Sequence, residues 1–125
     1  MKIKMDYGSE GIEVEVPETA SILRMRDTPR VEDVGLEIEK SLMEPIGTPS
    51  LPKLAQGRKD ACIVISDITR PVPNKILLPP ILRILEDQGI ARENIVILIG
   101  TGLHRPNEGE ELNRLVGADI AQKYR

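Results

Sequence analysis

IVISDITRPVPN, residues 63–74, and VILIGTGLHRPNEG, residues 96–109, decide the fold that we expect for this chain. In each stretch an apolar run gives way to polar residues, an Arg-Pro pair and an asparagine at the start of an expected helix. The apolar runs predict strands over residues 61–66 and 94–100. Strand, helix and strand in this order have the length of a βαβ unit, in which the strands are parallel and the crossover is almost always right-handed.

The segment between the two strands predicts one helix. Pro71 and Pro73 favour a loop after the first strand, because proline has no amide donor and restricts the residue before it. An aliphatic stripe then runs to about Gln88, and Gly89 stands where glycine commonly ends a helix. The pair Pro79–Pro80 leaves the first turn of this helix undefined. The stripe consists of Leu77, Leu78, Ile81, Leu82 and Leu85.

The first thirty residues predict a hairpin and a connector. Apolar and charged residues alternate over 2–6 and 11–16, on either side of a glycine-containing turn. Residues 17–30 have no clear period and are expected to be a connector. A helical spacing of apolar residues then begins near Val31 and ends at Pro45.

Two further segments complete the predicted elements. Residues 46–56 are rich in Pro, Gly and Ser, which predicts a loop. Asn107 with Glu110 three residues later is typical of a helix N-cap and predicts a helix over 108–116, with only a few residues after it. The whole pattern predicts an α/β fold: a mixed sheet with a parallel βαβ core and an amino-terminal β-hairpin, with helices packed on the sheet.

Length and composition limit the classes of function. A chain of 125 residues can bury a real core, so residues 1–125 are expected to form a single α/β domain. There is no Phe or Trp on which single-stranded nucleic acid could stack, and a net charge of -3 provides no basic stripe for phosphates. No apolar run approaches the roughly 18 residues of a membrane span. We therefore expect neither nucleic acid nor membrane as a partner.

The single cysteine gives two further expectations. Cys62 lies in the apolar run ACIVI, which favours a small core residue rather than a reactive thiol. One cysteine cannot build a disulfide framework, so a reducing compartment fits and we expect the protein to be cytoplasmic.

Chemically useful side chains follow both predicted parallel strands. The carboxyl ends of such strands lie at one edge of the sheet, so Asp67, Thr69 and Arg70 are expected to share a rim with Thr101 and His104. Arginine offers a planar fork for a carboxylate or phosphate, histidine can move a proton near neutral pH, and aspartate can orient either one. This set suits a small anionic substrate with a transferable proton.

Each of these residues also has a purely structural interpretation. Asp67 could cap a turn, Arg70 could form a surface ion pair, and His104 could be a loop histidine bonded to the backbone. The presence of three such residues on one rim favours a site. A metal site within this chain is not expected, because one His and one Cys are too few good ligands.

SDITRPVPN at 66–74, followed by IGTGLHRPNEGEEL at 99–112, resembles the lactate racemase family, whose enzymes use a nickel-pincer nucleotide. The resemblance extends through EKSLMEPIG at 39–47 and the hairpin. It implies that His104 is one of two catalytic histidines that work on opposite faces of a small 2-hydroxy acid. It also implies that Arg70 holds the substrate carboxylate and that Asp67 is an acidic partner in the same pocket.

The same resemblance implies that this chain is the amino-terminal part of a longer enzyme. The second histidine, the lysine that carries the cofactor and the nickel-binding histidine would lie beyond residue 125. The missing carboxyl-terminal part would then be a partner, and the isolated chain is expected to be inactive and to hold no cofactor. Two alternatives remain open: a non-catalytic phosphate- or carboxylate-binding module that uses Arg70 and the helix start near Asn107, and a structural or oligomerising domain.

Overall fold

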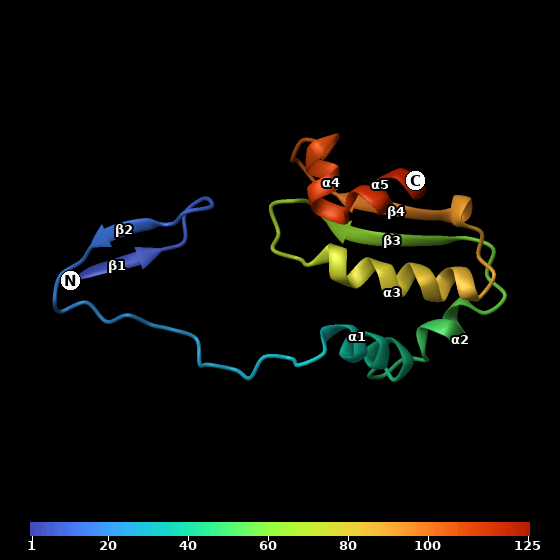
Figure 1. Cartoon of the computed structure of the whole chain (residues 1–125), viewed down its shortest axis with the longest axis horizontal. Coiled ribbons are helices and arrows are strands. Elements are labelled where there is room, and N and C mark those ends of the chain that lie inside the picture. Colours follow the sequence, from blue (N-terminus) through green and yellow to red (C-terminus); the bar gives the residue numbers. More distant parts are fainter. The chain divides into compact units, whose positions relative to one another are not determined.

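The computed structural model describes all 125 residues, which fall into two compact units, Met1–Arg30 and Val31–Arg125 (Figure 1). The expected α/β class, with a hairpin, a parallel strand pair and helices, is confirmed. The four strands form two separate two-stranded sheets, one antiparallel and one parallel. The hairpin strands therefore do not extend the parallel sheet.

The first unit is a hairpin followed by a connector. Strand β1 (Lys2–Met5) pairs antiparallel with β2 (Ile12–Glu15), with Met5 opposite Ile12. Gly11 has a φ of +76°, and a β-carbon there would lie 2.9 Å from the Met5 carbonyl oxygen. The turn thus requires glycine at this position. Residues 17–30 contain no helix or strand, as expected.

The second unit contains the predicted βαβ arrangement. Strand β3 (Ala61–Ser66) and strand β4 (Ile95–Gly100) are adjacent and parallel, and Ser66 lies opposite Gly100. Helix α3 (Asn74–Asp87) connects them and includes the pair Pro79–Pro80 in its interior. The helix begins at Asn74, five residues before Pro79, so the structure defines the first turn that the sequence left open.

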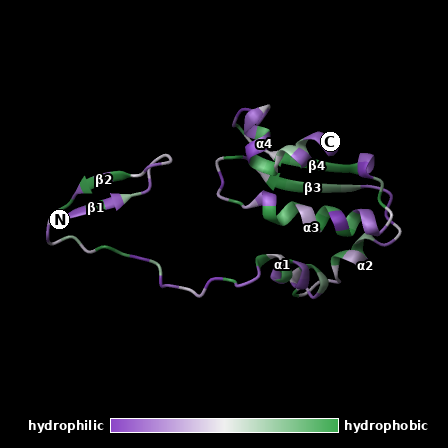
Figure 2. Cartoon of the chain, viewed as in Figure 1, coloured by the Kyte–Doolittle hydropathy of each residue, from purple (hydrophilic) through white to green (hydrophobic).

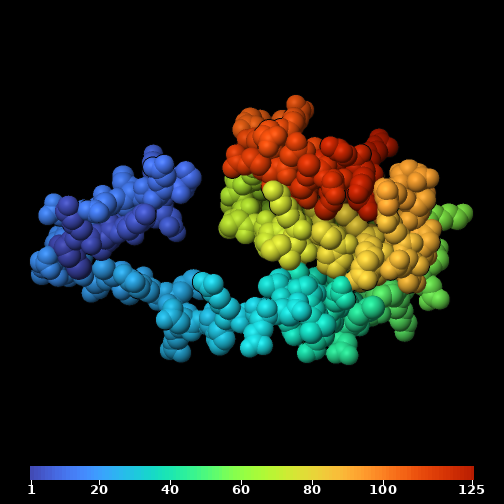
Figure 3. All heavy atoms as spheres, viewed as in Figure 1, coloured from blue at the N-terminus to red at the C-terminus, as the bar shows by residue number.

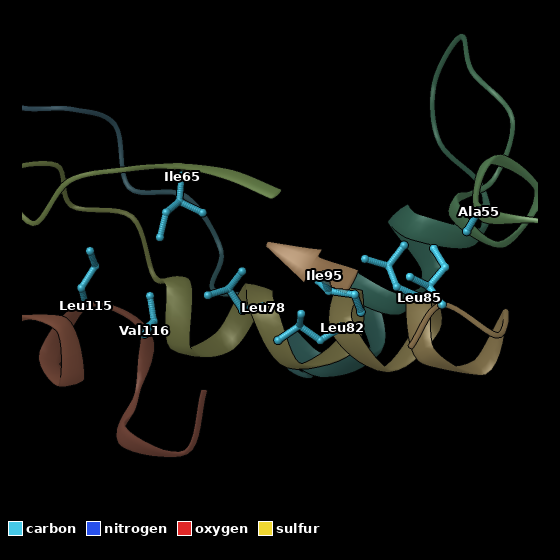
Figure 4. Packing of buried hydrophobic residues seen from close by; sticks show 9 residues of the cluster. Ala55, Ile65, Leu78, Leu82, Leu85, Ile95, Leu115 and Val116 are labelled. Carbon is cyan, nitrogen blue, oxygen red and sulfur yellow. The ribbon is translucent and has the colours of Figure 1, made fainter. Parts of the chain in front are cut away.

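One aliphatic core joins the helices to one face of the parallel sheet. In Figure 4, Leu78 and Leu82 of α3 point toward Ile65 of β3 and Ile95 of β4. Figure 2 shows both strands as hydrophobic, and in Figure 3 the atoms of α3 are in continuous contact with the orange-to-red segment that follows β4. Burial of these aliphatic side chains is the main force that holds the strand ends in register.

The opposite face of the parallel sheet is open, which corrects the expectation for Cys62. Side chains alternate along a strand, so the face that does not meet α3 carries Val64, 67% exposed, and Leu98, 52% exposed. Cys62 shares this face and is exposed, so its expected place in the core is wrong. The apolar run 61–66 favoured a core position for Cys62, but helices cover only the other face of the sheet.

Two short helices precede β3. Helix α1 (Val34–Met43) begins after Asp33, whose carboxylate accepts a hydrogen bond of 2.9 Å from the Leu36 amide. Helix α2 (Leu51–Ala55) lies within the segment expected to be a loop. That expectation was wrong because Pro52 stands in the first turn of α2, where a helix tolerates proline.

The carboxyl-terminal helices differ from the expected pattern. Helix α4 (Glu110–Val116) is capped by Gly109, not by Asn107, and it therefore starts two residues later than predicted. Helix α5 (Ala118–Lys123) follows directly after Gly117, where no helix was expected. Its partly buried Ile120 and Ala121 pack on the core, so tertiary burial stabilises a segment too short to be helical alone. None of the helices combines the length and the apolar character needed to cross a bilayer.

Candidate active site

The parallel register brings two loops together at one edge of the sheet. The β3–α3 loop comprises residues 67–73, and the β4–α4 loop comprises residues 101–109. Asp67 and His104 are 37 residues apart in sequence, and the His104 Nδ1 atom contacts the Asp67 Oδ2 atom. The structure thus brings these two predicted site residues into direct contact, as expected for strand ends that share a rim.

Asp67 uses its two carboxylate oxygens for different partners. Oδ1 accepts hydrogen bonds from the Thr69 hydroxyl at 2.6 Å and the Thr69 amide at 3.2 Å, while Oδ2 faces His104. The residue is 3% exposed. The Thr69 hydroxyl, and then the His104 ring, hold the pKa of this carboxyl below its ordinary value. Asp67 therefore caps the turn and orients the histidine at the same time.

The state of Asp67 determines the tautomer of His104. An ionised carboxylate is only an acceptor, so Nδ1 must carry the proton and donate it to Asp67. The other ring nitrogen, Nε2, is then free of a proton when the imidazole is neutral. Because 53% of the side chain is exposed, the ring can present this basic nitrogen to a ligand.

A tight turn places the imidazole. The His104 amide donates to the Thr101 carbonyl at 3.0 Å, and the Thr101 amide donates to the Ile99 carbonyl at 3.0 Å. Gly102 within this turn has a φ of +58°, which glycine adopts without strain. The glycine-containing sequence after β4 therefore serves to turn the chain sharply and bring His104 back over the strand ends.

Two hollows open on either side of the Asp67–His104 pair. The first, which we name the Arg70 hollow, has a volume of about 350 Å³. The second, the Asn107 hollow, has a volume of about 260 Å³. The Arg70 hollow is lined by Ser66, Asp67, Arg70, Gly100, Thr101, Gly102, Leu103 and His104, and the Asn107 hollow by Asp67, Ile68, Thr69, His104, Arg105 and Asn107.

The two hollows divide the predicted substrate-binding residues. Arg70 and Thr101 line the same hollow as the Asp67–His104 pair. Thr69 lines the other hollow, where its hydroxyl is already engaged by Asp67. Arg70 is exposed, and its guanidinium takes part in none of the ion pairs of the chain. Its fork is therefore available to a carboxylate ligand.

A second set of residues supports the loops, and the sequence did not indicate it. Arg105 forms a two-pronged pair with Glu111, at 2.6 and 2.7 Å, and the Asn107 amide nitrogen donates to Glu111 at 3.2 Å. Arg105, and then Asn107, lower the pKa of Glu111 to about 2. Asn107 lies ahead of α4, so its contact with Glu111 is not a helical i, i+4 pair and the spacing gave no usable signal.

Metal ligands do not gather in this chain. No group of three or more His, Cys, Asp or Glu side chains is arranged to hold a metal ion.

Comparison with known proteins identifies the family. The family model described as the lactate racemase N-terminal domain matches residues 7–125. The chain belongs to this family. Over 124 residues, 96% of this chain, it is 33% identical to the lactate racemase of Thermoanaerobacterium thermosaccharolyticum. It is 46% identical over 84 residues, 66% of this chain, to the lactate racemase of Lactiplantibacillus plantarum.

The fold also matches a solved structure. The lactate racemase apoprotein from Thermoanaerobacterium thermosaccharolyticum superposes with a TM-score of 0.79 and 31% sequence identity. That match covers 100% of this chain and 29% of the solved chain. In sequence, the matched regions are 19% and 29% of the two relatives. The chain therefore spans less than a third of the length of the relatives that it matches.

Proposed function

We propose that this chain is the amino-terminal part of an enzyme that inverts the C2 stereocentre of a small 2-hydroxy acid, with lactate as the first candidate. The observation that carries the proposal is the buried Asp67 carboxylate behind the solvent-facing His104 ring, with an unpaired arginine in the adjoining hollow. This is the arrangement of a histidine that exchanges protons with a ligand. Relatives named lactate racemase support a racemase-related role.

In this proposal His104 moves the hydroxyl proton. Its Nε2 accepts the proton of the 2-hydroxyl group while Nδ1–H donates to Asp67, and the Asp67 charge stabilises the imidazolium that results. Returning the proton to the oxygen restores the neutral ring. Because the Thr69 hydroxyl and amide also hold Asp67, the carboxylate stays fixed while the ring gains and loses charge.

Arg70 orients the substrate in this proposal. A bidentate pair with the substrate carboxylate fixes the plane of that group and therefore the direction of the C2–H bond. The Arg70 hollow, at about 350 Å³, lies at the lower end of the about 300–1,000 Å³ range of ligand sites, which suits a small acid. Thr101 lines the same hollow and is positioned to add a polar contact.

The family resemblance assigns a nickel-pincer nucleotide to the complete enzyme, where it would accept a hydride from C2 and return it to either face. Because the resemblance implies that the cofactor-carrying lysine and the nickel-binding histidine lie beyond residue 125, we propose that the cofactor contacts lie in the carboxyl-terminal part. The residues described here would hold the carboxylate, orient the hydroxyl group and move its proton. We also propose that the enzyme works in the cytoplasm.

The test is a racemisation assay across a panel of 2-hydroxy acid enantiomers, followed by circular dichroism or chiral chromatography. We expect turnover from the complete enzyme loaded with cofactor and none from the 125-residue chain alone. Unchanged enantiomers across the panel with the loaded enzyme would contradict the proposal.

The rival function is a non-catalytic anion-binding module, which the unpaired Arg70 guanidinium also favours. Such a module gains little from a buried carboxylate that fixes the histidine tautomer, and for that reason we prefer the enzyme. The His104→Gln variant distinguishes the two functions. An anion-binding module keeps its affinity for carboxylates in this variant, whereas the enzyme loses turnover.

A further inference from the structure

Asn107 joins the two loops of the candidate site. Its side-chain oxygen accepts a hydrogen bond of 3.2 Å from the amide of Ile68, which lies 39 residues earlier in the chain. Ile68 directly follows Asp67, and Asn107 comes three residues after His104. The β3–α3 and β4–α4 loops are connected by this hydrogen bond and by the contact between Asp67 and His104, and by no other hydrogen bond.

Both ends of the Asn107 amide have a fixed partner. The oxygen must accept, because the Ile68 amide only donates, and the nitrogen must donate, because Glu111 is ionised through its pair with Arg105. An asparagine supplies an acceptor on one side and a donor on the other. Aspartate would lack the donor, and alanine would lack both.

Burial argues that this bridge is more than a surface contact. Asn107 is 8% exposed, although asparagine is usually found at the surface. It does not cap α4, whose N-cap is Gly109. Its amide is thus buried to connect the loops, and Glu111 of α4, which is itself paired with Arg105, accepts a hydrogen bond from the amide nitrogen.

We propose that Asn107 is a positioning residue that holds the Asp67 carboxylate against His104 Nδ1, and so sets the Nδ1–H tautomer that leaves Nε2 basic. This role rests on the proposed function, because a fixed tautomer matters for proton transfer. Loss of the bridge frees the two loops to move separately. The imidazole then shifts toward the Nε2–H tautomer, which cannot accept a proton at Nε2.

The chain offers a direct measurement, because His104 is its only histidine. Nitrogen-15 NMR of the 125-residue chain at a pH of about 9, where a free imidazole is neutral, reports which ring nitrogen carries the proton. We expect the Nδ1–H form to dominate in the wild type and the Nε2–H form to rise at least several-fold in Asn107→Ala. Asn113→Ala, on α4 without a side-chain bond to the loops, is the matched control.

A second pair of variants covers the case in which Asn107→Ala does not fold. Asn107→Asp keeps the acceptor for Ile68 but sets two carboxylates against each other, so it is expected to lose the Nδ1–H form. Combining it with Glu111→Gln provides an amide that can donate to the new carboxylate, and this double variant is expected to regain the Nδ1–H form. A wild type without the Nδ1–H form, or a tautomer that Asn107→Asp leaves unchanged, would overturn the role of Asn107.

The NMR readout keeps this inference separate from the enzyme's activity. A complete enzyme that racemises nothing would contradict the proposed function and leave the tautomer result intact. If the complete enzyme is active, Asn107→Ala is expected to lower kcat about 10- to 100-fold with a smaller change in KM, because a misplaced catalytic group costs rate more than binding.

Discussion

The β3–α3 and β4–α4 loops share a pattern of residues but use it differently. Each contains Arg-Pro and then an asparagine before a helix. Arg70 is unpaired beside the Asp67–His104 pair, whereas Arg105 is tied to Glu111 by two hydrogen bonds. Asn74 is the first residue of α3, whereas Asn107 lies ahead of α4 and bridges the loops. The same Arg-Pro and asparagine pattern therefore leaves an arginine available for a ligand in one loop and builds a structural support in the other.

The largest effect is expected where the two loops meet. His104→Ala in the complete enzyme removes the group that we propose moves the proton, and we expect kcat to fall about 10²- to 10⁴-fold. Nickel content, measured in parallel, is expected to stay unchanged. Normal racemisation by this variant would remove the assigned role, and loss of nickel would make His104 a cofactor contact.

The two arginines are expected to respond differently to the same substitution. Arg70→Lys keeps the charge but loses the bidentate fork, so we expect KM to rise and kcat to fall, each about 10-fold. Arg105→Lys, the matched change in the other loop, retains one contact with Glu111 and is expected to shift KM by no more than about 3-fold. Steady-state kinetics measure both. Equal effects of the two substitutions on KM would contradict the expected difference between Arg70 and Arg105.

The two asparagines are expected to differ in stability. Asn107→Ala leaves the partly buried Ile68 amide without its acceptor, and such a loss costs about 1–3 kcal/mol. In Asn74 the side-chain nitrogen is buried without a hydrogen-bond partner, so Asn74→Ala removes an unsatisfied group and is expected to cost less than about 0.5 kcal/mol. The free energy of unfolding in urea tests this. A larger loss from Asn74→Ala would reverse the comparison.

The smallest effect concerns acid stability. Glu111 has a pKa of about 2 in the folded chain against an ordinary value of 4.5, so its stabilising contribution is fully present above pH 4.5. That contribution decreases as the pH falls toward 2, because a carboxyl with a depressed folded pKa takes up protons more readily when unfolded. Glu111→Gln is expected to make the unfolding free energy less dependent on pH in this window, in denaturant titrations at several pH values. An identical pH dependence would contradict the paired state of Glu111.

Local patterns predicted most of the scaffold around the site. Each predicted element has a repeating pattern of apolar side chains: the alternation in the hairpin, the apolar runs of β3 and β4, and the stripe of α3. Such a pattern can be recognised from residues that are close together in the sequence. The βαβ order then predicted a parallel pair, and with it the shared rim of Asp67 and His104.

The predictions that were wrong concern features that depend on residues far apart in the sequence. Helix α5 forms because its apolar side chains find the core, and its six residues carry too weak a signal by themselves. Cys62 is exposed because no helix covers its face of the sheet, which the apolar run around it cannot reveal. Asn107 fits the sequence pattern of a helix N-cap, but the N-cap of α4 is Gly109, which has a φ of +55°.

The sequence by itself determined the strands, their parallel order and the five polar residues that follow their carboxyl ends, because these depend on local periodicity and on a connection long enough to hold a helix. Only the tertiary structure decided which arginine is unpaired, which hollow Thr69 lines and which asparagine connects the loops. A hydrogen bond such as that between Ile68 and Asn107 joins residues 39 positions apart. Such a bond forms only when the packed core brings two strand ends to the same edge of the sheet.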